Sequence, residues 1–126
     1  MSVEYYYTKN KDGFMGSENR KVKKKSETCE EQLRRMCKAH AEEITDKKIS
    51  VEDLMESVLD IEWITFNDHK YKAARLLVAF GGPNVWVNTQ TEMIEGYWGA
   101  DEISWHFKDN IGLDNHLSEM HAHNTN

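Results

Sequence analysis

The sequence is poor in cysteine and proline. Pro83 is its single proline, and Cys29 and Cys37 are its two cysteines. The cysteines lie eight residues apart in one predicted helix, which separates them by about 12 Å of helical rise. That distance is too long for a disulfide. We therefore expect two reduced, mostly buried thiols.

Long apolar runs are also missing. No stretch approaches the roughly 20 apolar residues that a membrane-spanning helix needs. The first residues, MSVEYYYTKNKDG, lack the apolar core of a signal peptide. Both absences predict a cytoplasmic protein with no membrane contact. The chain has 126 residues, of which 39% are hydrophobic and 30% charged, as expected for one globular domain.

The charge is acidic overall but unevenly distributed. The net charge is -6. Residues 1–25 carry seven basic and three acidic side chains, whereas residues 26–126 carry nine basic and 19 acidic ones. This predicts a basic, flexible arm over 1–25 and a single acidic domain over 26–126. The domain would attract basic surfaces, and the arm would contact nucleic acid only weakly.

Helical periodicity dominates the first half of the domain. Apolar residues at helical spacing predict a helix over about 27–45, with Ser26 as its N-cap. A second helix is expected after Ser50, which begins a Ser-x-x-Asp capping box. A short final helix, capped by Asp109 and weakened by Gly112, is predicted near the C-terminus.

Strand patterns fill the region between these helices. Strands are predicted over 61–66, 71–80, 85–87, 93–98 and 103–107. Gly81-Gly82-Pro83-Asn84 forms a corner, where Asn84 tolerates a left-handed conformation. The predicted fold class is α+β: an antiparallel meander of four to five strands, covered by two N-terminal helices and a short C-terminal helix.

Residues with metal-ligand spacing are sparse. Cys37 and His40 with Cys29 upstream, and His121 with His123, come closest. Neither set reaches the four-ligand pattern of a structural zinc site, and packing on an apolar helix face explains the first set. We therefore expect no metal and no cofactor.

One strand could carry catalysis. Alternation places Glu102, Ser104 and His106 on the same face, where a Ser-His pair could act as nucleophile and base in a small hydrolase or nuclease. An ordinary polar sheet face has the same pattern. The sequence contains no phosphate-binding loop, GxGxxG, HExxH or CxxC motif to support the catalytic alternative.

Acidic residues form a second pattern. Glu52, Glu56 and Asp60 repeat at a spacing of four, which places charges about 6 Å apart along one helical face, and Glu62 follows. Such a row could imitate nucleic-acid phosphates in a basic groove. The alternative is a solvated helix face.

Aromatic residues form a third pattern. Strand parity prevents Trp86, Tyr97 and Trp98 from all lying on one face, so some are expected to be partly exposed interface anchors. The alternative is that helices cover both faces and every ring is core. The candidate partner-binding residues are Glu52, Glu56, Asp60, Glu62, Trp86, Glu95, Tyr97 and Trp98.

The run LLVAFGGPNVWVNT, followed by IEGYWG, resembles a family of small proteins from phages and mobile elements of Gram-positive bacteria. The resemblance covers roughly residues 59–120 and implies a shared fold, with no catalytic residue to transfer. It further implies an inhibitor of host defence, such as an anti-CRISPR or anti-restriction protein. The basic arm departs from a pure DNA mimic.

Three functional hypotheses follow. The first is a non-enzymatic inhibitor that binds a bacterial defence protein, such as a CRISPR effector, in the cytoplasm of the host. The second is a small hydrolase or nuclease that uses Glu102, Ser104 and His106. The third is an accessory regulatory protein of the mobile element, for which a dimer is one possible state.

Overall fold

The computed structural model describes the backbone of residues 4–6 and 23–25 and all of residues 28–124. The chain divides into two compact units, residues 1–32 and 33–126. In the first unit, β1 (Glu4–Tyr6) pairs with β3 (Lys23–Lys25) in an antiparallel ribbon. Most of the predicted basic arm lies outside the described residues, so its flexibility stays a prediction.

Helix α1 (Cys29–Thr45) begins with a complete capping box. The Thr28 hydroxyl accepts a hydrogen bond from the Glu31 N–H at 3.1 Å, and the Glu31 carboxylate accepts one from the Thr28 N–H at 2.9 Å. The N-cap is therefore Thr28 and not the predicted Ser26. Cys29 is exposed, contrary to the prediction of a buried thiol, whereas Cys37 is buried.

Helix α2 begins where the sequence predicts, whereas α3 begins later than predicted and leaves Ile111 and Gly112 outside the helix. Ser50 caps α2 (Val51–Ser57) by accepting a hydrogen bond from the Asp53 N–H at 3.0 Å. Asp109 caps α3 (Leu113–Asn124) by accepting from the N–H groups of Leu113 and Asp114, at 2.9 and 2.8 Å. Gly112 does not weaken this helix from within, because it lies just before it at a φ of 77°.

Five strands form one antiparallel meander in the order β4-β5-β6-β7-β8. Their bounds are β4 Asp60–Thr65, β5 Tyr71–Ala79, β6 Asn84–Asn88, β7 Met93–Trp98 and β8 Asp101–His106. In the corner between β5 and β6, Gly81 takes the positive φ of 117°. Asn84 instead starts β6, contrary to the expectation of a left-handed conformation there. The predicted α+β fold is confirmed.

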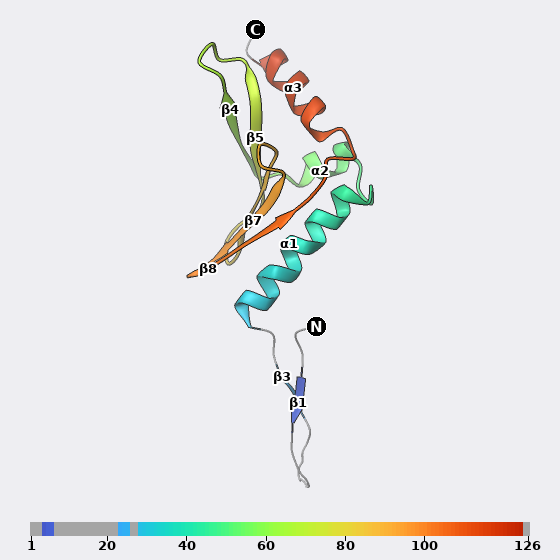
Figure 1. Ribbon diagram of the computed structural model, residues 1–126, viewed down its shortest axis with the longest axis vertical. Helices are drawn as coiled ribbons and strands as arrows, with labels where there is room; N and C mark the ends of the chain where they lie inside the picture. Colours follow the sequence, from blue (N-terminus) through green and yellow to red (C-terminus); the bar gives the residue numbers. More distant parts are fainter. Residues whose placement is uncertain (1–3, 7–22, 26–27, 125–126) are drawn as a thin grey trace. The chain divides into compact units, whose positions relative to one another are not determined.

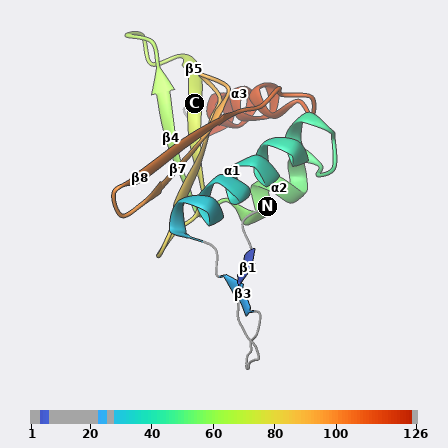
Figure 2. The ribbon, with the colours of Figure 1, turned by 60° about the horizontal axis from the view of Figure 1, so that its bottom comes forward.

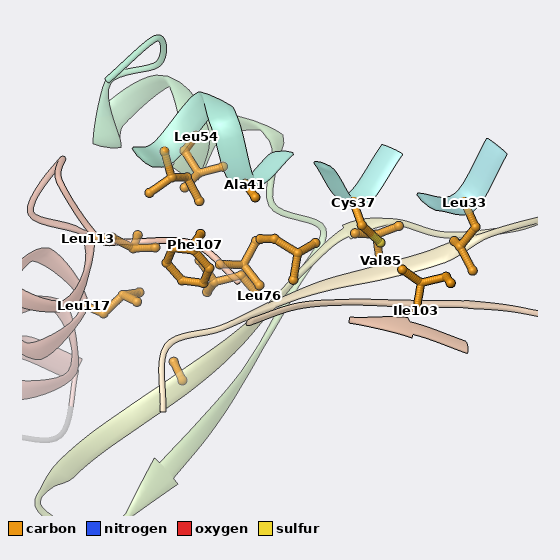
Figure 3. Close-up of a cluster of buried hydrophobic side chains, with 14 residues drawn as sticks. Leu33, Cys37, Ala41, Leu54, Leu76, Val85, Ile103, Phe107, Leu113 and Leu117 are labelled. Atoms are coloured by element: carbon orange, nitrogen blue, oxygen red, sulfur yellow. The ribbon is translucent and has the colours of Figure 1, made fainter. Parts of the chain in front are cut away.

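Within residues 33–124, the helices lie on one side of the sheet (Figures 1 and 2). Figure 3 shows the core between these layers, where Leu33 and Cys37 of α1 face Val85 and Ile103 of the sheet. The strands contribute alternate residues to this core, because successive side chains point to opposite faces. The helices therefore bury one sheet face and leave the other without a covering element from residues 33–124.

No helix in the described part of the chain is both long enough and apolar enough to cross a bilayer.

Candidate functional site

The candidate site is the sheet face turned away from the helices, which we call the open face. Strand pairing defines its members, because directly paired residues share a face. Glu62 pairs with Arg75, Arg75 with Asn88, and Trp86 with Glu95. Its polar and aromatic residues are Asp60, Glu62, Arg75, Asn84, Trp86, Asn88, Glu95, Tyr97, Glu102, Ser104 and His106.

Arg75 is the centre of the open face. Its Nη1 donates to Glu62 Oε1 at 2.7 Å, and its Nε and Nη2 both donate to Glu95 Oε1, at 3.2 and 3.0 Å. Burial alone would lower the pKa of the guanidinium, but the hydrogen bonds and charges of both carboxylates raise it. One cation on β5 therefore joins carboxylates from β4 and β7, which are separated by β5 and β6 in the sheet, so the contacts span four strands.

The same guanidinium stacks on an aromatic ring. The Arg75 Cζ lies 4.3 Å from the centroid of the Trp86 ring, within the range of a cation–π contact. Asn88 Nδ2 donates to the second oxygen of Glu95 at 3.0 Å, so both oxygens of this carboxylate are engaged. The side chains of Arg75 and Glu95 are only 23% and 17% exposed. We call these side chains the Arg75 cluster: Glu62, Arg75, Trp86, Asn88 and Glu95. The centre of the cluster is partly desolvated, and its hydrogen bonds hold it in one geometry.

Tyr97 extends the cluster toward β8. Tyr97 pairs with Asn84 of β6 on one side and with Glu102 of β8 on the other. Burial raises the pKa of the Tyr97 hydroxyl, and the negative charges of Glu95 and Glu102 raise it further, while Arg75 acts in the opposite direction. The phenol consequently stays neutral at physiological pH and offers a half-buried ring with a polar tip.

The open face brings together many, but not all, of the residues predicted from sequence. Asp60, Glu62, Trp86, Glu95 and Tyr97 lie on it.

The remaining predicted residues lie elsewhere. Glu52 and Glu56 are exposed on α2, which ends at Ser57. Asp60 is therefore the first residue of β4, and the predicted helical row of three acids does not form. Trp98 lies on the helix-covered face, where it packs against the core.

The predicted catalytic trio also lies on the open face. Glu102, Ser104 and His106 are all exposed on the edge strand β8, as alternation predicted. Among the described residues, no hydrogen bond joins Ser104 to His106. Residues two apart on a strand are separated by roughly 6.7 Å of rise, so this pair lacks the contact that activates a nucleophile.

Exposed apolar side chains lie at one end of β4 and β5. Leu59, just before β4, is 62% exposed, and Phe80, just after β5, is 73% exposed. Because Asp60 pairs with Leu77, the start of β4 lies beside the end of β5, so both side chains belong to the same end of the sheet. Phe66 is a third exposed apolar residue, 54% exposed, at the far end of β4.

The described residues contain no group of three or more His, Cys, Asp or Glu side chains placed to hold a metal ion. The Nδ1 atom of His40 lies 3.6 Å from Oε1 of Glu43, one turn further along α1. Burial lowers the pKa of its imidazole, and the Glu43 carboxylate opposes that shift.

Arg75 and Asn88 hold the site together but are not among the residues predicted from the sequence. Arg75 lies within the predicted apolar strand 71–80. A signal was nevertheless present: a single arginine in an apolar strand is expected to find carboxylates on the neighbouring strands, and Glu62 and Glu95 supply them.

Comparison of the chain with protein-family models, with curated proteins and with solved structures finds no match in any of the three.

Proposed function

We propose that this protein binds another protein through its open face and does not catalyse a reaction. The Arg75 cluster is the observation that carries this proposal. Its guanidinium is fixed by Glu62, Glu95 and Trp86 before any partner arrives. Long side chains that are already ordered lose little conformational entropy on binding, which favours association. Arginine and aromatic residues are also the types that concentrate at interface hot spots.

Exposed apolar groups beside the face add to this support. Phe80 and Leu59 project at one end of the sheet and would lose 73% and 62% exposure if a partner covered them. A partner that covered these two side chains would gain from burying their apolar surface.

The partner we propose is a bacterial defence protein, with a CRISPR effector as the first to test. Two features support it: the resemblance of roughly residues 59–120 to a phage and mobile-element family, and the acidic character of residues 26–126. An acidic protein can compete with nucleic acid for a basic groove. In this proposal the inhibitor acts in the cytoplasm of the bacterial host.

The test is phage plating on bacteria whose CRISPR system targets that phage. Expression of the protein should raise the efficiency of plating by at least tenfold. Trp86→Ala and Tyr97→Ala should abolish the rise, because they remove the open-face aromatics. Phe66→Ala is the matched control, since it removes an exposed ring at the far end of β4.

Thermal unfolding followed by circular dichroism shows whether each variant is folded. Folded Trp86→Ala and Tyr97→Ala variants that still protect the phage would overturn the open face as the binding surface. No protection by the wild-type protein against any CRISPR or restriction system would overturn the defence target.

A further inference from the structure

The charge of the open face narrows the chemistry of its partner. The open face carries four carboxylates, those of Asp60, Glu62, Glu95 and Glu102, and one guanidinium, that of Arg75. The face is therefore net negative by three charges when histidine is neutral. Such a surface repels phosphate groups and attracts cations, which disfavours a nucleic acid as the molecule that covers it.

The carboxylates are not equivalent. Glu62 and Glu95 are already paired with Arg75. In the described part of the chain, neither Asp60 nor Glu102 makes an ion pair, and both side chains are exposed. Asp60 only accepts a hydrogen bond from the N–H of its neighbour Ile61, at 2.9 Å. These two carboxylates are the ones left to meet an external cation.

Their positions frame the aromatic centre. Asp60 lies on β4 and Glu102 on β8, the two edge strands of the sheet labelled in Figure 1. Four strand spacings of about 4.8 Å separate the edges by roughly 19 Å. Trp86 and Tyr97 lie on the strands between them. A partner that spans the face would therefore bring its cations to both edges and its stacking groups to the middle.

We propose that the open face recognises a protein surface that bears arginine or lysine side chains. This inference rests on the proposed function. Cations of the partner pair with Asp60 and Glu102, and the apolar stems of the same side chains pack on Trp86 and Tyr97. Glu62 and Glu95 stay bound to Arg75 and keep the aromatic rings in place.

A direct test uses a short synthetic peptide that carries several arginines, and NMR of the tryptophan indole N–H groups. The Trp86 signal, assigned by its loss in Trp86→Phe, should shift on titration, and the affinity should fall with salt. The double variant Asp60→Lys/Glu102→Lys should weaken binding at least tenfold. The matched control is Glu56→Lys/Glu119→Lys, which changes the net charge equally at exposed positions on α2 and α3.

Three results would overturn the inference. The first is an unshifted Trp86 signal, and the second is equal weakening by the control pair. The third is tighter binding of a peptide with the sequence of residues 1–25, which would make a second copy of this chain the occupant.

The plating assay separates this inference from the proposed function. Protection that is lost in Tyr97→Ala but kept in Asp60→Lys/Glu102→Lys overturns the cationic partner alone. Protection that is kept in both overturns the open face altogether.

Discussion

Gly96 sets how closely α1 approaches the sheet, and replacing it tests this packing. A Cβ at position 96 would lie 2.6 Å from Cys37 Sγ and 2.8 Å from Leu33 Cδ1. Both side chains are fully buried, so neither can swing into solvent. Gly96→Ala must therefore push α1 away from β7 or force Leu33 out of its rotamer.

The magnitude follows from two opposing effects. Overpacking a well-filled core costs about 1–3 kcal/mol, whereas replacing glycine by alanine inside a strand returns about 0.5–1 kcal/mol. The steric cost is larger. We expect Gly96→Ala to lower the free energy of unfolding by about 1–2 kcal/mol, which corresponds to a fall in Tm of roughly 5–10 °C.

Urea unfolding followed by circular dichroism measures this change. Cys37→Ala removes the closest atom, so the double variant Gly96→Ala/Cys37→Ala should be more stable than the sum of the single changes predicts, by about 1 kcal/mol. Gly82→Ala is the matched control, because a Cβ there would lie at an ordinary 3.5 Å from the Trp98 ring. Wild-type stability in Gly96→Ala, or strict additivity in the double variant, would refute the reasoning.

Two further predictions concern stability. Burial raises the pKa of the Cys37 thiol from 9.0 to about 11, so the unfolded chain releases this proton at a lower pH than the folded one. The contribution of this thiol to the free energy of unfolding should consequently be constant below pH 9 and fall by about 2 kcal/mol between pH 9 and 11. Between pH 9 and 11 the urea midpoint of Cys37→Ala should fall less steeply than that of the wild-type protein. An identical fall in both proteins would contradict the attribution to the Cys37 thiol. Asp109→Ala should cost about 1–2 kcal/mol because it removes the acceptor for the first N–H groups of α3. Asp109→Asn, which keeps one acceptor oxygen, should lose less, and equal losses in both variants would argue against capping.

The fold was predictable because its signals are local. Helical spacing from Leu33 to Ile44 specifies the buried face of α1, and alternation specifies the buried residues of β8. Errors arose where two local signals competed. Ser26 and Thr28 are both plausible caps, and only the reciprocal hydrogen bond with Glu31 distinguishes them. The acidic row failed because Val58 adopts an extended conformation after Ser57, so helical spacing no longer applies at Asp60.

The candidate site was less predictable because its geometry depends on strand register. Alternation assigned the Trp86 ring to the opposite face from Val85 and Val87, and burial agrees with this assignment. Alternation alone could not show that Arg75 lies beside Glu62 and that Trp86 lies beside Glu95, since those neighbours come from pairing across three hairpins. A shift of one residue in any hairpin would move a whole strand's side chains to the other face.

The Arg75 cluster contributes to the proposed function through its charge pattern, because its ion pairs add little to stability. Burying a guanidinium with two carboxylates costs desolvation that the ion pairs largely cancel, so apolar residues of similar size would stabilise the sheet at least as well. What the cluster supplies is a fixed charge pattern: a neutralised centre with Trp86 beneath the guanidinium and unpaired carboxylates at the edges. An apolar patch would attract any hydrophobic surface, whereas this pattern discriminates by charge. Polar residues are ordinary on an uncovered sheet face, so the proposed cationic partner is supported by the arrangement of these charges and not by their presence alone.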